Sequence, residues 1–167
     1  MPLRDYIFTK EARKNNKLRK ISVPSMLKKI DCTPANRLKC QGYCCNLTLA
    51  CRPQFHPEEI KKLPPRLKKF IESDGKVTVI DNKCPLVEDC LKNPNIKSVD
   101  CMLAPLGFNK KGTLIIKRWV WLKPCPFYGK GKPIYIAMKD CLIDAFGEKI
   151  YNDIVQEVKN VSKKHTN

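Results

Sequence analysis

Apolar residues near the C-terminus recur at steps of three and four, and they form the clearest helical pattern in the chain. The positions are Leu142, Ile143, Phe146, Ile150, Ile154 and Val158. Asp140 lies near the start of this pattern and lysines follow its end, which suits the helix dipole. The pattern predicts an amphipathic helix of about 20 residues, whose apolar face packs on the rest of the chain.

Two runs rich in β-forming residues predict strands. Residues 113–122 follow Lys111-Gly112 and end before Pro124, and residues 76–80 end at Asp81-Asn82. The first run places Trp119 and Trp121 on one face, together with Lys117 and Lys123. We expect at least one of these tryptophans to pack against the C-terminal helix; stacking on nucleic-acid bases is the alternative use.

Short helices are predicted elsewhere by proline and capping residues. Residues 57–63 and 65–71 each begin with proline, which the first helical turn tolerates, and His56 marks the start of the first helix. Ser25 is expected to cap another short helix that includes Met26, Leu27 and Ile30 and that ends at Thr33-Pro34.

These elements predict an α+β fold: a small single domain in which short helices and a small sheet surround a cysteine-ligated metal centre. The 167 residues and the 43% hydrophobic content suit one compact unit. We expect residues 1–31 to form a basic N-terminal arm with a short helix, and residues 32–138 to form a cysteine-cluster domain. Residues 139–167 are expected to form the C-terminal amphipathic helix and its tail.

The formal net charge of +17 is concentrated toward the N-terminus. Only Asp5 and Glu11 oppose the basic residues there, which include Lys10, Arg13, Lys14, Lys17, Arg19, Lys20, Lys28 and Lys29. Such an arm favours an anionic partner, either RNA or an acidic protein surface, and it suits a subunit of a larger complex. A basic protein without any such partner is the alternative.

Ten cysteines require a separate explanation. The opening residues lack an apolar signal core, and no stretch approaches the roughly 18 to 20 apolar residues of a membrane span. We therefore expect a cytoplasmic protein that does not enter membranes. Thiols stay reduced in the cytoplasm, so many spaced cysteines indicate metal binding rather than disulfides.

The cysteines fall into groups that define the candidate metal ligands. Cys40 and Cys44 are four residues apart, so one helical turn would project both thiols from the same face. The main candidate ligands are Cys40, Cys44, Cys84, Cys90, Cys101 and Cys125, followed by Cys45 and Cys51. Cys84 and Cys125 each precede a proline, which stiffens the turn around a ligand. Cys32 and Cys141 lie outside these groups and are not expected to bind metal.

The order of these motifs resembles a known family. Cys40-Gln41-Gly42-Tyr43-Cys44-Cys45, Cys84-Pro85-Leu86 with Cys90, and the segment from Cys101 to Gly107 are similar to the CxxxCC family of zinc- or iron-chelating proteins, the YkgJ-like cysteine-cluster proteins. The segment from Cys125 to Lys132 is similar to the glycine-rich Cys-Pro stretch of many members. The family usually has arginines around its third conserved cysteine, where this chain has Asp100 and Met102.

The resemblance extends to the flagellin lysine methylases, which carry a four-iron cluster. It therefore implies an iron-sulfur (4Fe-4S) protein, with Zn²⁺ as the alternative. Ligand chemistry points the same way, because the chain has only two histidines, His56 and His165, and the ligands must be almost all thiolate. The set fits either one four-ligand centre with additional thiols or two centres.

Three functions follow from these observations. The first is a metal-binding protein that serves electron transfer, sensing or the stabilisation of a larger complex. The second is a basic RNA- or ribosome-associated protein with a structural metal. The third, a methyltransferase-like enzyme, has the least support, because no recognisable catalytic motif is present. The glycines and lysines of 129–132 are expected to form a solvated loop rather than a phosphate-binding loop, since the P-loop pattern is incomplete.

Overall fold

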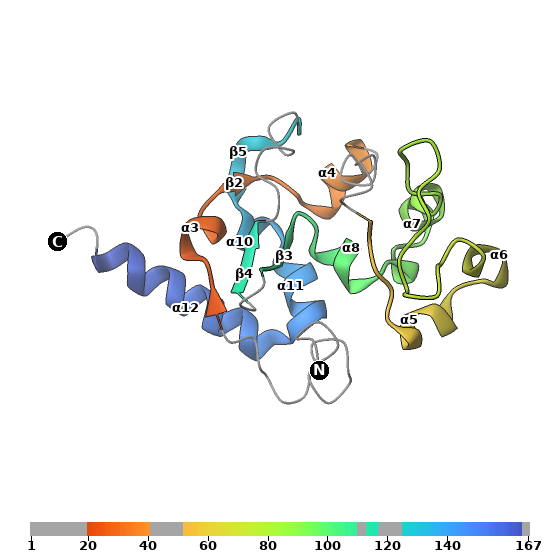
Figure 1. The fold of residues 1–167 in the computed structure, drawn as a ribbon. Helices are drawn as coiled ribbons and strands as arrows, with labels where there is room; N and C mark the ends of the chain where they lie inside the picture. Colours follow the sequence, from red (N-terminus) through yellow and green to blue (C-terminus); the bar gives the residue numbers. More distant parts are fainter. Residues whose placement is uncertain (1–19, 41–51, 110–112, 117–124, 165–167) are drawn as a thin grey trace.

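A computed structural model describes residues 20–40, 52–109, 113–116 and 125–164 of the chain. Within these ranges, short helices and two small sheets form an α+β fold (Figure 1). This arrangement confirms the coarser prediction of an α+β fold with short helices and little sheet. The buried apolar side chains form two separate clusters, one built around the three-stranded sheet and the last helices, the other from residues 55–90.

The three-stranded sheet brings together distant parts of the chain. Strand β1 (Lys20–Ile21) pairs in parallel with β4 (Thr113–Ile116), which pairs antiparallel with β3 (Leu106–Phe108). The backbone N–H of Ser22 continues the parallel ladder by donating to the carbonyl of Leu114 at 2.9 Å. Leu114 is fully buried at the centre of the first cluster. The predicted strand 113–122 is thus present as β4, and its residues 117–122, with Trp119 and Trp121, lie outside the described part of the chain.

The two-stranded sheet pairs β2 (Lys29–Ile30) antiparallel with β5 (Tyr128–Pro133). Lys29 lies opposite Pro133 and Ile30 lies opposite Tyr128, so the register shifts between two consecutive residues of β2. Residues 129–132 therefore have no partners on β2 and form a bulge. Helix α10 (Ile134–Ala137) follows β5 directly.

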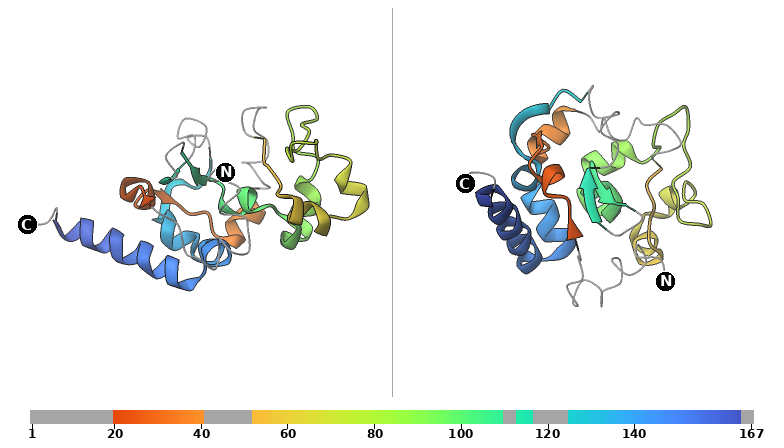
Figure 2. Two further views of the ribbon diagram at one scale, coloured as in Figure 1. Left: turned by 60° about the horizontal axis from the view of Figure 1, so that its bottom comes forward. Right: turned by 60° about the vertical axis from the view of Figure 1, so that its left-hand side comes forward.

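The predicted C-terminal helix is two helices, α11 (Lys139–Phe146) and α12 (Glu148–Lys164). They separate at Gly147, whose φ of +88° suits glycine and whose N–H donates to the carbonyl of Ile143. Figure 2 shows α12 along one side of the molecule, away from the part that residues 52–97 form. No helix of the described ranges combines the length and apolar character that crossing a bilayer requires.

The N-terminal part contains two helix caps that differ from the prediction. Helix α3 (Val23–Met26) begins after Ser22, whose side chain accepts from the N–H of Ser25, so Ser25 is not the cap. Ile30 belongs to β2, which pairs with β5, and its side chain is buried in the first cluster. Thr33, predicted to end a helix, instead caps α4 (Pro34–Lys39) by accepting from the N–H of Asn36 at 3.2 Å.

The second cluster is formed by short helices and turns. Helices α5 (Pro57–Lys62) and α6 (Pro65–Lys68) confirm the two predicted helices, and α7 (Val87–Lys92) and the 3-10 helix η3 (Pro94–Ile96) follow. His56 is the N-cap of α5, as predicted. The predicted strand at 76–80 is absent from these described residues, which form only isolated bridges such as Ile71 with Val77. The positive φ of Asp81 and Asn82 turns the chain immediately afterwards.

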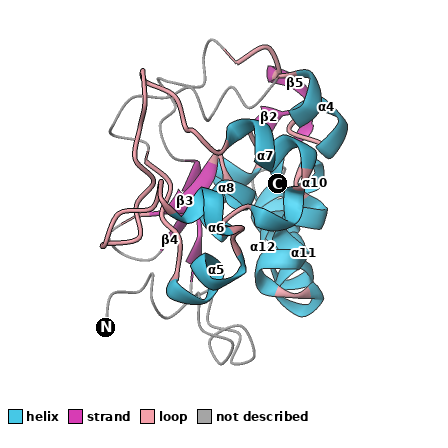
Figure 3. Cartoon of the chain, turned by 90° about the vertical axis from the view of Figure 1, so that its right-hand side faces the viewer, coloured by secondary structure: helices cyan, strands magenta, loops and turns pink. Residues whose placement is uncertain are grey.

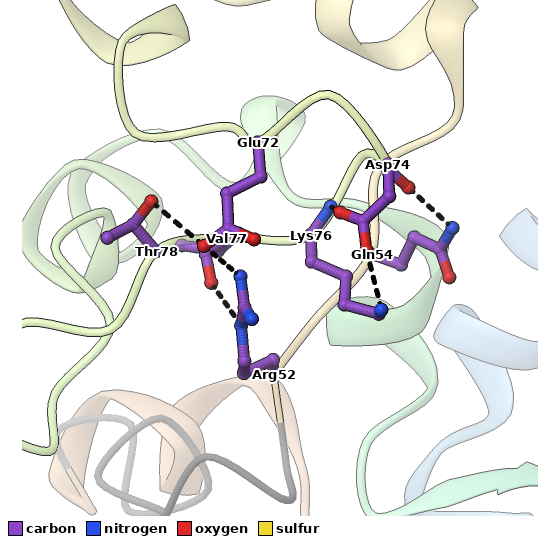
Figure 4. Close-up of polar contacts among 7 residues, drawn as sticks. All are labelled: Arg52, Gln54, Glu72, Asp74, Lys76, Val77 and Thr78. Atoms are coloured by element: carbon purple, nitrogen blue, oxygen red, sulfur yellow. Dashed lines mark hydrogen bonds and ion pairs between the residues drawn. The ribbon is translucent and has the colours of Figure 1, made fainter.

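Polar contacts hold together the turns of this second part (Figure 4). The Nε of Arg52 donates to the carbonyl of Val77 at 2.9 Å, and its guanidinium pairs with Glu72. The hydrogen bond from Arg52 lowers the pKa of the Glu72 carboxyl below its ordinary value. Arg52 directly follows Cys51, so this network anchors the point at which the chain leaves the cysteine-rich segment 40–51.

Glu59 connects the second cluster to the first. One oxygen of its carboxylate accepts from the N–H of His56 at 2.8 Å, which completes the capping box of α5. The other oxygen accepts from the N–H of Val99 at 2.9 Å, at the start of helix α8 (Val99–Leu103). Val99 and Leu103 are buried in the first cluster. One carboxylate therefore satisfies the N-termini of two helices that belong to different clusters.

We expect Glu59→Ala to lower the free energy of unfolding by about 2 kcal/mol, because two backbone N–H groups lose a charged acceptor. Urea denaturation followed by circular dichroism measures this loss. Glu58→Ala is the matched control: Glu58 is the preceding residue, but its partner is the exposed Lys61, so its removal should cost clearly less. Equal losses in the two variants would show that Glu59 does not connect the clusters.

Candidate metal centre

The two Cys-Pro motifs form the same turn in different parts of the fold. In the first, the N–H of Val87 donates to the carbonyl of Cys84 at 3.2 Å; in the second, the N–H of Tyr128 donates to the carbonyl of Cys125 at 3.0 Å. Each proline occupies the second position of its turn, where its fixed φ is favourable. The shared motif in the sequence thus has a shared backbone geometry.

Both turns direct backbone N–H groups at the cysteine sulfur. Burial raises the pKa of the Cys84 thiol, while a hydrogen bond from the N–H of Leu86 acts in the opposite direction. Burial also raises the pKa of Cys125, against hydrogen bonds from the N–H groups of Phe127 and Tyr128. Such N–H groups stabilise a thiolate, which is the form that binds metal, and hydrogen bonds to sulfur tune metal-thiolate centres.

The fold brings the segments that carry Cys32, Cys40 and Cys125 near one another. Cys32 follows β2 and Cys125 precedes β5, and the N–H of Asp31 donates to the carbonyl of Phe127 at 3.3 Å between them. Both Cys32 and Cys40 lie close enough to raise the pKa of Cys125 further by charge repulsion. We call Cys32, Cys40 and Cys125 the first thiol group. Its members come from the segments at β2, α4 and β5 (Figures 1 and 3).

Helix α4 sets the position of Cys40 within this group. Cys40 is the C-cap of α4, and its N–H donates to the carbonyl of Asn36 at 2.9 Å. The side-chain amide of Asn36 donates to the carbonyl of Asp31 at 2.8 Å, which ties the helix back to the end of β2. A capped helix therefore spans the distance between Cys32 and Cys40.

Cys84 and Cys90 form a second thiol group in the second hydrophobic cluster. Both are buried, beside Leu86, which precedes α7 and whose carbonyl accepts from the N–H of Cys90 at 2.9 Å. Asp89, the neighbour of Cys90 on α7, forms an ion pair with Arg66, which fixes α7 against α6. Buried thiols of this kind suit either metal ligation or a purely apolar core.

Cys101 lies on α8, the helix that Glu59 connects to the second cluster. Its N–H donates to the Oγ of Ser98, the N-cap of α8, at 3.2 Å. Asp100, beside it, accepts from the N–H of Gln54 at 3.2 Å. Asp100, which stands before Cys101 in the segment where this chain departs from the family pattern, thus has a structural contact.

The predicted ligand set remains a prediction. Cys44, Cys45 and Cys51 lie outside the described residues, as does most of the N-terminal arm. Among the residues that are described, no three His, Cys, Asp or Glu side chains are arranged to hold a metal ion. No two of the seven described cysteines are joined by a disulfide.

Sequence reasoning missed the place of Cys32. Cys32 lies two residues after Ile30 of β2 and gave no spacing signal, because its neighbours in space come from the pairing of β2 with a strand much later in the chain. Cys141, the other cysteine outside the motifs, lies on α11 and packs at the edge of the first hydrophobic cluster.

No family model, curated protein or solved structure matches this chain. The likeness to the CxxxCC family therefore rests on the motifs themselves.

Gly131 provides a test of how the first thiol group is positioned. A Cβ at Gly131 would lie 2.5 Å from the Cγ of Asp31, the residue before Cys32, whereas a Cβ at Gly129 would meet nothing within 4 Å. Both glycines have a positive φ, of +69° and +75°. Alanine at either position costs about 1 kcal/mol for that backbone conformation, so Gly129→Ala is a matched control.

We expect Gly131→Ala to destabilise the protein by about 1–3 kcal/mol more than Gly129→Ala, because Asp31 must move. The shift should also make Cys32 react faster with iodoacetamide under native conditions. Adding Asp31→Gly to Gly131→Ala should restore part of the loss, since it removes the atoms that clash. If both single variants unfold at the same urea concentration, the close approach does not position Cys32.

Proposed function

We propose that this protein is a cysteine-cluster metal-binding protein that holds an iron-sulfur cluster, with zinc as the second candidate. The proposal rests on one observation above all: hydrogen bonds link Cys40, which begins the Cys40-x3-Cys44-Cys45 segment, through Asn36 and Asp31 to the turn that carries Cys125, although the two segments are far apart in sequence. A metal ion would bind such thiols as thiolates, and its positive charge would offset the repulsion among them.

The donor chemistry of the described residues fits such a group. The sulfurs of Cys84 and Cys125 accept backbone N–H groups, as ligands of metal-thiolate centres commonly do. His56 is engaged elsewhere, because its Nδ1 accepts from the N–H of Glu58 in the cap of α5. The site would therefore be built from thiolates, a soft donor set that suits an iron-sulfur cluster or zinc and disfavours magnesium or calcium.

The residues proposed to hold the metal are those that the sequence predicts, arranged in two groups. Cys40 and Cys125, with Cys44 and Cys45 from the adjoining segment, would supply the first centre, and Cys84, Cys90 and Cys101 would supply further ligands. A four-iron cluster would provide one-electron chemistry, whereas zinc would serve as a structural cross-link. Roles in electron transfer, sensing or the stabilisation of a complex all follow from such a centre.

Substitution of single cysteines tests the assignment. We expect Cys40→Ser and Cys125→Ser each to lose most of the bound metal, because each removes a thiolate from the proposed centre. Cys141→Ser is the control, since Cys141 is half-buried on α11 and belongs to neither thiol group. Elemental analysis of protein purified without oxygen, together with visible absorption for iron-sulfur, provides the measurement. Full metal content in Cys40→Ser would contradict the proposal.

Removal of the metal should unfold the protein, because the proposed ligands extend from Cys40 to Cys125 and tie both hydrophobic clusters together. We expect a chelator to abolish the cooperative thermal transition and to reduce the far-UV circular dichroism signal. Restoring the metal under reducing conditions should recover both signals. A verified metal-free sample that still melts cooperatively at the same temperature would show that the fold does not need the metal.

A further inference from the structure

Positive charge is concentrated on the segments that form the two-stranded sheet. Residues 20–40 and 125–137 contain a single acidic residue, Asp31, against seven basic ones: Lys20, Lys28, Lys29, Arg37, Lys39, Lys130 and Lys132. The acidic residues of the second cluster are different, because four of them form ion pairs there: Glu58 with Lys61, Glu72 with Arg52, Asp74 with Lys76 and Asp89 with Arg66. The charge of the sheet is therefore not balanced locally by its own segments.

The pairing of β2 with β5 gathers four of these lysines on one exposed surface. We call Lys28, Lys29, Lys130 and Lys132 the basic ribbon, and all four side chains are exposed. The carbonyl of Lys28 accepts from the N–H of Ile134 at 2.8 Å, and Lys29 lies opposite Pro133, so both lysines flank the bulge that carries Lys130 and Lys132. Figure 3 shows β2 and β5 together at one end of the molecule.

The bulge has a backbone suited to contact with phosphate. Gly129 and Gly131 both have a positive φ, and they are exposed together with the lysines between and after them. A Cβ at Gly129 would meet no other atom within 4 Å, so a ligand could approach the main chain closely there. Chains that alternate in backbone conformation at glycine present their N–H groups to anions.

Aromatic side chains stand next to the lysines. Phe127 and Tyr128 directly precede the bulge, and both are only half-buried. Tyr128 packs against the first hydrophobic cluster, which holds its ring in place at the base of the ribbon. Cations beside partly exposed aromatic rings are the combination with which proteins bind single-stranded nucleic acid, where phosphates meet the charges and bases stack on the rings.

We propose that the basic ribbon, with Phe127 and Tyr128, is a binding site for single-stranded nucleic acid. None of its members is a cysteine, although Phe127 and Tyr128 belong to the turn whose N–H groups face the sulfur of Cys125. It shares Lys28 and Lys29 with the basic N-terminal arm, but the fold adds Lys130 and Lys132 from a distant segment. An acidic protein would be attracted by the same charges, but it would gain nothing from aromatic rings positioned for stacking.

The test compares two variants that remove the same charge. Lys130→Gln with Lys132→Gln removes two cations from the ribbon, and Lys62→Gln with Lys159→Gln removes two exposed cations from α5 and α12. A fluorescein-labelled oligouridylate is the probe, and fluorescence anisotropy gives its affinity at several salt concentrations. Unchanged circular dichroism and metal content check that both variants remain folded.

We expect the ribbon variant to bind the probe about 25-fold more weakly at 0.1 M salt, and its log-log salt slope to become shallower by about 1.4, because each phosphate contact contributes about 0.7. The control should lose less than about threefold, since charges beyond about 10 Å are screened at this salt. Equal losses in the two variants, or no binding of the intact protein at low salt, would overturn the proposal.

A second comparison tests the aromatic contact and excludes an acidic protein. We expect Phe127→Leu to weaken the binding of oligouridylate at least about fivefold, which corresponds to about 1 kcal/mol, the lower range for one stacked base. The same substitution should leave the binding of inorganic polyphosphate unchanged, because polyphosphate has no bases. If polyglutamate displaces the oligouridylate as well as unlabelled oligouridylate does at equal charge, the ribbon is a surface for acidic proteins and the proposal is wrong.

Discussion

The antiparallel pairing of β2 with β5 is the contact on which the arrangement of this molecule depends. It joins a segment near residue 30 to one near residue 130, and buried Ile30 and Ile134 accompany it in the first hydrophobic cluster. Pairing across so long a loop costs entropy, and the buried apolar side chains on both segments offset that cost. Without this pairing, neither the first thiol group nor the basic ribbon would exist, because each takes residues from both segments.

The close approach of Gly131 to Asp31 makes this pairing precise. Glycine is required there for two reasons at once: the φ is positive, and a side chain would occupy the position of the Asp31 carboxyl. Cys32 follows Asp31, so this backbone contact helps to place its thiol, whose side chain also packs against the first hydrophobic cluster. The Asn36 amide then extends the same constraint to Cys40 through α4.

The second hydrophobic cluster is joined to the first mainly through α8. Glu59 and Asp100 accept backbone N–H groups across this joint, from Val99 and Gln54 respectively. Cys101 lies within α8, between the thiols of the two clusters along the chain. A metal held by cysteines from both parts would reinforce the connection that these polar contacts already make. Cysteines that are spread over the chain could then act on the same connection.

Local features of this protein were predictable from its sequence alone. Proline after His56 and after Pro64 started α5 and α6, because helix initiation depends on neighbouring residues. The α+β class and the β-forming run at 113–116 were predictable for the same reason. The apolar spacing around Leu142 and Ile154 located the C-terminal helices, although Gly147 was overlooked as the point where the first of them ends.

Only the tertiary structure determined which residues from distant segments of the chain are neighbours. Ile30 lies four residues after Met26, which suits a helix. It is nevertheless a strand residue, because it pairs with Tyr128, a residue that only the tertiary fold brings next to it. The run at 76–80 favours a strand locally, but no described strand continues a ladder along it, so it forms only bridges. Cys32 matched no motif, and its place beside Cys125 follows from the β2–β5 register alone. Chemical types and local turns are encoded residue by residue, whereas the neighbours of a thiol or a lysine depend on pairings between distant segments, which the fold as a whole selects.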